Sequence, residues 1–182
     1  MKAVYTRPKL LKEADFHYCP GCGHGIITRL LMEVIEEMDL QGDAICVAPA
    51  GCGMLLYNYF EIDVLESAHG RGAAVATGIK RVRPQNLVFS YQGDGDLAAI
   101  GTAEGFHAAN RGENITVIFV NNGVYGMTGG QMVEDVRLAL EGRGHVHFYG
   151  RPGGVVPMPV ELYRIISRHY YQAHADGDRR QP

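Results

Sequence analysis

The residues with the clearest chemical potential lie at the two ends of one segment, Leu87 to Asn122. The sequence Gly-Asp-Gly-Asp at residues 93–96 follows a first apolar run, and Asn121-Asn122 follows a second. Aspartate and asparagine offer the hard oxygen ligands that Mg²⁺ prefers, and glycine lets the main chain approach a phosphate closely. Taken alone, each of these short sequences is more often an ordinary turn than a binding site. Their occurrence at both ends of one segment favours a site.

The pattern around these residues is that of a strand, a helix and a second strand. The apolar run Leu87–Tyr91 predicts a strand, residues 97–110 a helix, and Ile115–Val120 a second strand. Both strands of such a crossover end at the same edge of a parallel sheet, where open α/β folds bind ligands. We therefore expect an α/β fold with a mostly parallel sheet and flanking helices, in which Asp94 and Asn122 face one another across a cleft.

A second chemical signal is the sequence CPGCGH at residues 19–24. Two thiolates two residues apart can bind one metal ion, and the residues alone leave a zinc half-site, a redox dithiol and an iron–sulfur half-site open. Cys52 follows a strand predicted over Ala44–Ala48 and lies between two glycines, where a ligand is expected. Cys46 lies inside that strand and is interpreted as a core residue.

Two further helices are expected from the sequence. An apolar stripe predicts an amphipathic helix over residues 26–38, whose apolar side chains belong to the core. Residues 68–80 are rich in glycine and alanine, a composition that permits close approach of another backbone. His69 stands at the expected start of that helix, where a histidine is more commonly a capping or core residue.

Composition excludes several classes of function. The 182 residues carry a formal net charge of −3 and are 46% hydrophobic, which suits one buried core. No basic tract indicates a nucleic-acid partner or a membrane surface, and no apolar run is long enough to span a membrane. The amino terminus lacks the apolar core of a signal peptide. We expect a soluble, cytoplasmic protein.

The motifs described above resemble those of a known family. Gly93-Asp94-Gly95 followed by Asn121-Asn122 resembles the thiamine diphosphate motif, and VYGMTGGQ at residues 124–131 is similar to the β subunits of 2-oxoacid:ferredoxin oxidoreductases. These enzymes oxidatively decarboxylate 2-oxoacids to acyl-CoA, and the resemblance, of the 2-oxoisovalerate or 2-oxoglutarate type, covers residues 1–132. It implies a thiamine diphosphate-binding fold with thiamine diphosphate, Mg²⁺ and a [4Fe-4S] cluster. The implied partners are an α subunit, further γ or δ subunits, ferredoxin, a 2-oxoacid and CoA.

Carried over by position, the resemblance implies three groups of site residues. Mg²⁺ would be bound by Asp94, Asn122 and the main-chain carbonyl of Val124. The cofactor would contact Ala50, Gly51, Cys52, Gly53, His69, Gly95, Asp96, Gly126 and Met127. The cluster would be bound by Cys19, Cys22 and Cys52, without a fourth cysteine.

The end of the chain departs from this pattern. Residues 133–172 resemble the carboxyl-terminal end of the α subunit of the same enzymes and include a helix predicted over Glu161–Tyr171. A junction between the two resemblances is expected near Met132, and residues 173–182 are predicted to be disordered. The resemblance also implies that the other half of the thiamine site belongs to the α subunit, so the isolated chain is expected to be inactive. Two alternatives remain: a zinc or iron–sulfur electron-transfer module that uses the three cysteines and a histidine such as His24, and a non-catalytic hybrid chain.

Overall fold

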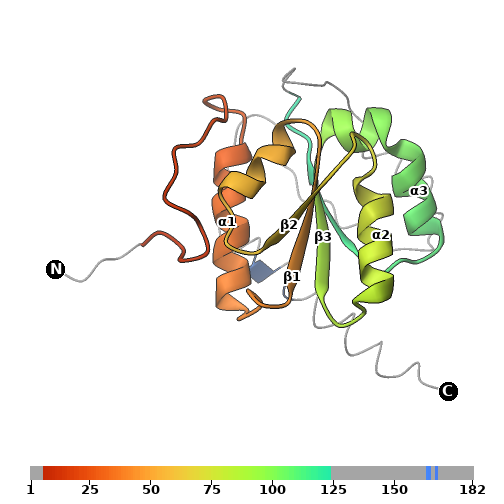
Figure 1. Cartoon of the computed structure of the whole chain (residues 1–182). Coiled ribbons are helices and arrows are strands. Elements are labelled where there is room, and N and C mark those ends of the chain that lie inside the picture. The colour runs from red at the N-terminus through yellow and green to blue at the C-terminus, as the bar shows by residue number, and fades with distance from the viewer. Residues whose placement is uncertain (1–5, 124–162, 165–166, 168–182) are drawn as a thin grey trace.

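A computed structural model describes residues 6–123, 163, 164 and 167 of the chain (Figure 1). Helices and strands alternate along the first of these ranges except where η2 is followed directly by α3. Two of the helical segments are not α-helices: η1 is a 3₁₀-helix and η2 a π-helix. The elements are α1 (His24–Glu37), β1 (Ala44–Pro49), η1 (Cys52–Asn58), β2 (Asp63–Ser67), α2 (Gly72–Val82), β3 (Leu87–Gly93), η2 (Gly95–Ile100), α3 (Thr102–Asn110) and β4 (Thr116–Val120).

The four strands form one parallel sheet in the order β2-β1-β3-β4. Ala44 of β1 pairs with Leu87 of β3, and Gly93 at the end of β3 pairs with Val120 at the end of β4. The predicted α/β class, the parallel sheet and the crossover from β3 to β4 are therefore confirmed. Strand β2 was not predicted, because it is an edge strand whose mostly exposed residues do not form an apolar run.

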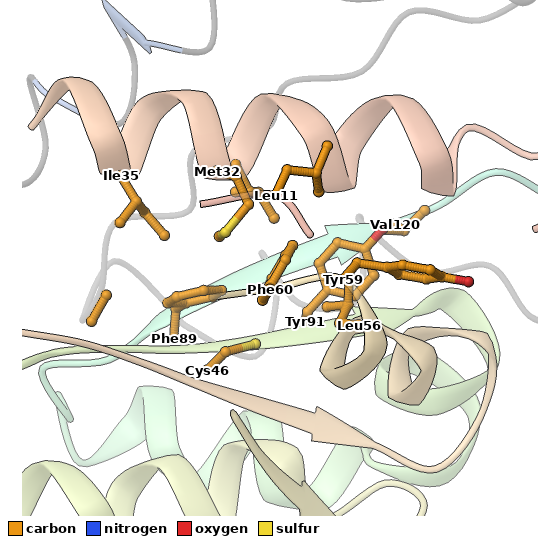
Figure 2. Packing of buried hydrophobic residues seen from close by; sticks show 12 residues of the cluster. Leu11, Met32, Ile35, Cys46, Leu56, Tyr59, Phe60, Phe89, Tyr91 and Val120 are labelled. Atoms are coloured by element: carbon orange, nitrogen blue, oxygen red, sulfur yellow. The ribbon is translucent and has the colours of Figure 1, made fainter. Parts of the chain in front are cut away.

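Helices cover both faces of the sheet, with α1 on one side and α2 and α3 on the other (Figure 1). The larger core lies beneath α1, where Met32 and Ile35 pack with Phe89 and Tyr91 of β3 and with Cys46 of β1 (Figure 2). The opposite face buries a smaller cluster beneath α2. Alternate side chains of a buried strand thus pack into the cores on the two faces of the sheet. The interpretation of Cys46 as a core residue is confirmed.

Two predicted helices differ from the observed ones near the carboxyl end of the sheet. Helix α2 begins at Gly72, so the placement of His69 at the helix start was wrong, and His69 lies in the preceding turn. The helix predicted over residues 97–110 is divided at Gly101 into η2 and α3. A Cβ atom at Gly101 would lie 2.6 Å from the main-chain oxygen of Gly70, so this close approach of two backbones accompanies the division.

The predictions for the end of the chain fall largely outside the described residues. Tyr163, Arg164 and Ser167 are helical, as the expected last helix requires. The predicted junction near Met132 and the predicted disorder of residues 173–182 lie outside the described part of the chain. Within that part, no helix has the length and apolar character needed to cross a membrane.

Candidate functional site

A cavity of about 80 Å³ opens at the carboxyl ends of β1 and β3. Strand order reverses here, because the chain moves from β1 to β2 on one side and continues from β3 to β4 on the other. Open α/β sheets bind their ligands at such a switch point. The cavity is lined by His17, Tyr18, Cys19, Cys22, His24, Pro49, Ala50, Gly51, Cys52, Gly53, Leu55, Tyr91, Gly93, Asp94, Asp96 and Asn122.

Asp94 and Asn122 reach this cavity from neighbouring strand ends, as predicted. The buried carboxylate of Asp94 accepts hydrogen bonds from the main-chain amides of Gly95 (2.8 Å) and Gly123 (3.2 Å). The side-chain nitrogen of Asn122 donates to the main-chain oxygen of Cys22 at 2.7 Å. Asn122 is thereby oriented by a residue of the amino-terminal segment, far away in the sequence.

The charges around the cavity suit a cation. Asp94 and Asp96 both line it, whereas no lysine or arginine does so among the residues that the structure describes. The hydrogen bonds that Asp94 accepts come from uncharged amides, which do not neutralise a buried carboxylate. The oxygen donors of Asp94 and Asn122 therefore fit a hard cation such as Mg²⁺.

Asp96 has a different environment from Asp94. Its carboxylate accepts hydrogen bonds from Nδ1 of His69, from the main-chain amide of Gly70 (2.7 Å) and from the side-chain nitrogen of Gln92. These contacts fasten the turn before α2 to the end of β3. Asp96 lines the cavity, but its oxygens already accept hydrogen bonds from groups within the protein.

The predicted cofactor residues are only partly brought together. Ala50, Gly51, Cys52 and Gly53 line the cavity, and Gly51 has a φ of 125°, which favours glycine. His69 lies close to this loop, since a Cβ atom at Gly51 would be 3.5 Å from its ring, but it does not line the cavity. Gly95, also absent from the lining, donates its amide to Asp94, while Val124, Gly126 and Met127 lie outside the described residues.

The three cysteines predicted to bind a cluster all line the cavity. Cys19 is exposed, Cys52 is partly buried and Cys22 is buried. Cys46 is fully buried on the core side of β1, and this burial raises the pKa of its thiol. Among the described residues, no three histidine, cysteine, aspartate or glutamate side chains are close enough together to hold a metal ion in this structure. The three thiols line one cavity, but in this structure they are not close enough together to bind one metal ion.

Sequence reasoning missed a buried pair of aromatic side chains, His24 and Tyr91. Nδ1 of His24 lies 2.8 Å from the Tyr91 hydroxyl, and the Tyr18 ring stacks on the His24 ring with 5.0 Å between centroids. Burial lowers the pKa of His24, and the nearby Asp94 carboxylate opposes that shift. Burial also raises the pKa of Tyr91 well above its ordinary value. The sequence had suggested His24 only as an alternative zinc ligand.

These features define an α/β protein with a cavity at the switch point of a parallel sheet, the place where such folds bind ligands. Residues 54–152 match the family model of the C-terminal TPP binding domain of thiamine pyrophosphate enzymes. The chain belongs to this family of thiamine diphosphate-binding domains.

The proteins to which this chain is similar include subunits of 2-oxoacid oxidoreductases. The chain is 53% identical over 116 residues to ketoisovalerate oxidoreductase subunit VorA of Methanothermobacter thermautotrophicus, a match that covers 64% of this chain and 24% of the relative. It is 45% identical over 116 residues to 2-oxoglutarate synthase subunit KorB of Methanocaldococcus jannaschii, over 63% of this chain and 43% of the relative. The predicted resemblance to the β subunits of 2-oxoacid:ferredoxin oxidoreductases is confirmed.

The chain is also similar to a solved structure of a 2-oxoacid oxidoreductase. The 2-oxoglutarate:ferredoxin oxidoreductase from Magnetococcus marinus, solved with 2-oxoglutarate, coenzyme A and succinyl-CoA bound, superposes with a TM-score of 0.62 at 32% identity. This match covers 71% of the present chain and 45% of the other. The matches therefore cover 24% to 45% of the length of these relatives.

Proposed function

We propose that this chain is the thiamine diphosphate-binding part of a cytoplasmic 2-oxoacid:ferredoxin oxidoreductase. The whole enzyme would decarboxylate a 2-oxoacid oxidatively in the presence of CoA and pass the electrons to ferredoxin. The observation that carries the proposal is the presence of Asp94, Asn122 and three cysteine thiols around one switch-point cavity. Membership of the thiamine diphosphate-binding family and the named relatives support it.

The metal and the diphosphate would be held at the ends of β3 and β4. Asp94, Asn122 and the carbonyl of Val124 would bind Mg²⁺, which would in turn neutralise the diphosphate. Thiamine diphosphate would contact Ala50, Gly51, Cys52, Gly53 and His69, and its diphosphate would be lined by Gly95, Asp96, Gly126 and Met127. When bound, thiamine diphosphate supplies an electron sink for bond cleavage next to a carbonyl group.

An iron–sulfur cluster would be bound on the other side of the cavity. Cys19, Cys22 and Cys52 provide three thiolates, and a [4Fe-4S] cluster ordinarily takes four such ligands. The shared cavity supports this assignment, because a one-electron carrier there would lie next to the cofactor that is oxidised. The exposure of Cys19 leaves this side of the site open to a partner such as ferredoxin.

We propose a branched-chain 2-oxoacid as the substrate and an α subunit as the main partner. The VorA relative, named for ketoisovalerate, is more similar to this chain than the KorB relative named for 2-oxoglutarate. The apolar side chain of Leu55 in the cavity lining is compatible with such a substrate. The α subunit would contribute the remaining part of the thiamine site.

Calorimetric titration of the full chain, alone and with its α subunit, tests the proposal. Thiamine diphosphate is expected to bind only when Mg²⁺ is present, and Asp94→Ala should abolish this binding. Glu37→Ala, an exposed change at the far end of α1, is the control and should bind normally. Unaltered binding by Asp94→Ala would contradict the assignment, and zinc without iron or thiamine diphosphate would favour an electron-transfer or zinc module.

A further inference from the structure

The hydrogen bond between Tyr91 and His24 bears on which ring nitrogen of His24 carries the proton. Tyr91 is fully buried, and among the described residues the hydrogen bond of its hydroxyl goes to Nδ1 of His24 at 2.8 Å. A buried phenol whose proton has no acceptor is costly, and Nδ1 of His24 is an acceptor within hydrogen-bond distance of this hydroxyl. A neutral imidazole carries one N–H, and with Nδ1 as the acceptor that N–H is at Nε2.

Neighbouring residues hold the ring in place beside the cavity. Gly23, with a φ of 80°, directs the main chain into α1 so that His24 is its first residue. Tyr18 stacks on the imidazole with an angle of 19° between the rings, which restricts rotation of the ring. Because His24 lines the cavity and its Nδ1 is engaged by Tyr91, Nε2–H is the donor that it offers there.

An uncharged N–H group of His24 could donate a hydrogen bond to an anionic ligand in the cavity. An anionic ligand bound through a cation at Asp94 has no lysine or arginine among the described lining residues to contact. Among the described lining residues, its outer oxygens can therefore accept hydrogen bonds only from groups other than lysine and arginine side chains. His24 supplies such a group in the lining of the cavity that Asp94 also lines.

We propose that His24 is a cofactor-binding residue, held by Tyr91 as the Nε2–H tautomer, that donates a hydrogen bond to a diphosphate oxygen of thiamine diphosphate. Tyr91 is the positioning residue of this pair. The ligand in this inference rests on the proposed function, whereas the tautomer does not.

Nitrogen NMR of the full chain labelled with ¹⁵N-histidine tests the tautomer without any cofactor. His24→Gln identifies the His24 signals by their loss, and the wild type is expected to show Nε2 protonated and Nδ1 unprotonated. Tyr91→Phe removes the phenolic donor and should shift these signals away from a pure Nε2–H pattern. A wild-type spectrum with the proton on Nδ1, or one that Tyr91→Phe leaves unchanged, would overturn the proposal.

Two amide variants test the donor itself. The side-chain nitrogen of glutamine can occupy the place of Nε2, whereas the amide of asparagine reaches only the place of Nδ1. By calorimetry with Mg²⁺ and thiamine diphosphate, His24→Gln should bind within about threefold of the wild type, and His24→Asn about 10- to 100-fold more weakly, as for one hydrogen bond to a charged group. Circular dichroism should show both variants folded.

The two parts of the inference fail separately. Equal affinities of the Gln and Asn variants would overturn the role of the donor while leaving cofactor binding intact. A wild-type chain that binds no thiamine diphosphate, even with its α subunit, would overturn the proposed function and the ligand assignment. The NMR result would still decide whether Tyr91 fixes the tautomer of His24.

Discussion

The carboxylate of Asp96 accepts a hydrogen bond of 2.7 Å from the main-chain amide of Gly70, which belongs to the turn that follows β2. Asp94, only two residues earlier, makes its hydrogen bonds to the amides of Gly95 and Gly123 instead. The short sequence at residues 93–96 therefore carries two carboxylates, Asp94 and Asp96, that have different roles. Asp96 joins two strand ends, and Asp94 faces the site proposed for a cation.

Asparagine substitutions should separate these two roles. Asp96→Asn is expected to lower the free energy of unfolding by about 1–3 kcal/mol in the absence of cofactor, because an amide cannot accept all the hydrogen bonds that the buried carboxylate accepts. Asp94→Asn should affect stability less but lose Mg²⁺-dependent binding of thiamine diphosphate. Urea denaturation without ligand measures the difference. Equal stability losses in the two variants would contradict this division.

The contact of α2 with the sheet depends on a glycine. A Cβ atom at Gly72 would lie 2.6 Å from Cγ of Pro49 and 2.8 Å from Cδ of Gln92, both of which are packed in the fold. We expect Gly72→Ala to destabilise the protein by about 1–3 kcal/mol through overpacking.

Gly78, on the exposed side of the same helix, provides the matched control. A Cβ atom there would meet nothing within 4 Å, so Gly78→Ala should stabilise the protein by about 0.5–1 kcal/mol through the lower entropy of its unfolded state. Urea denaturation of both variants tests the pair. A stabilising Gly72→Ala would show that the packing of α2 is looser than described.

The four cysteines should differ in reactivity in the folded protein. Cys19 is exposed and should be alkylated rapidly by iodoacetamide, whereas Cys46 is buried and its raised pKa disfavours the reactive thiolate. Mass spectrometry of peptides after brief labelling of the apoprotein should find Cys46 modified only after addition of denaturant. Native labelling of Cys46 at the rate of Cys19 would mean that β1 opens readily.

A charge cluster between α2 and the turn before β4 predicts a pH dependence of stability. Glu113 contacts Arg81 and Arg111, and these hydrogen bonds, that of Arg81 first, lower the pKa of its carboxyl. The contribution should be complete above the unfolded carboxyl pKa of about 4.3 and be lost as the pH falls through the lower pKa of the folded state.

Glu113→Gln tests this dependence. The variant should melt below the wild type at pH 7, by a small margin that salt reduces because the arginines are exposed, and the two melting curves should converge at strongly acidic pH. A difference that persists unchanged in acid would assign the effect of Glu113 to something other than its charge.

The parts of the fold that could be predicted are those in which a local pattern decides the structure. Strands β1 and β3 are buried on both faces, so their apolar runs are visible in the sequence. Strand β2 could not be recognised, because an edge strand needs few apolar residues and Asp63 begins it in an exposed position. The start of α2 depends on how the turn at Gly70 meets Asp96, which is a tertiary contact.

The same distinction applies to the site. Asp94 and Asn122 could be placed at one edge of the sheet because the carboxyl ends of parallel strands lie together. The cysteines could be assigned to the same site only through the resemblance to a known family. The pairing of His24 with Tyr91 could not be foreseen, because no spacing rule relates the first residue of a helix to the middle of a distant strand. Only the packing of α1 against β3 brings the two together.

The order of the strands also bears on how the protein is synthesised. Strand β1 pairs with β2 and with β3, yet β3 leaves the ribosome only after all of α2. A nascent chain that ends before Leu87 therefore has one side of β1 without its partner strand and lacks Phe89 and Tyr91 beneath α1. Such an unpaired, apolar edge invites aggregation, so the interval in which α2 and β3 are translated is when this chain most needs a chaperone.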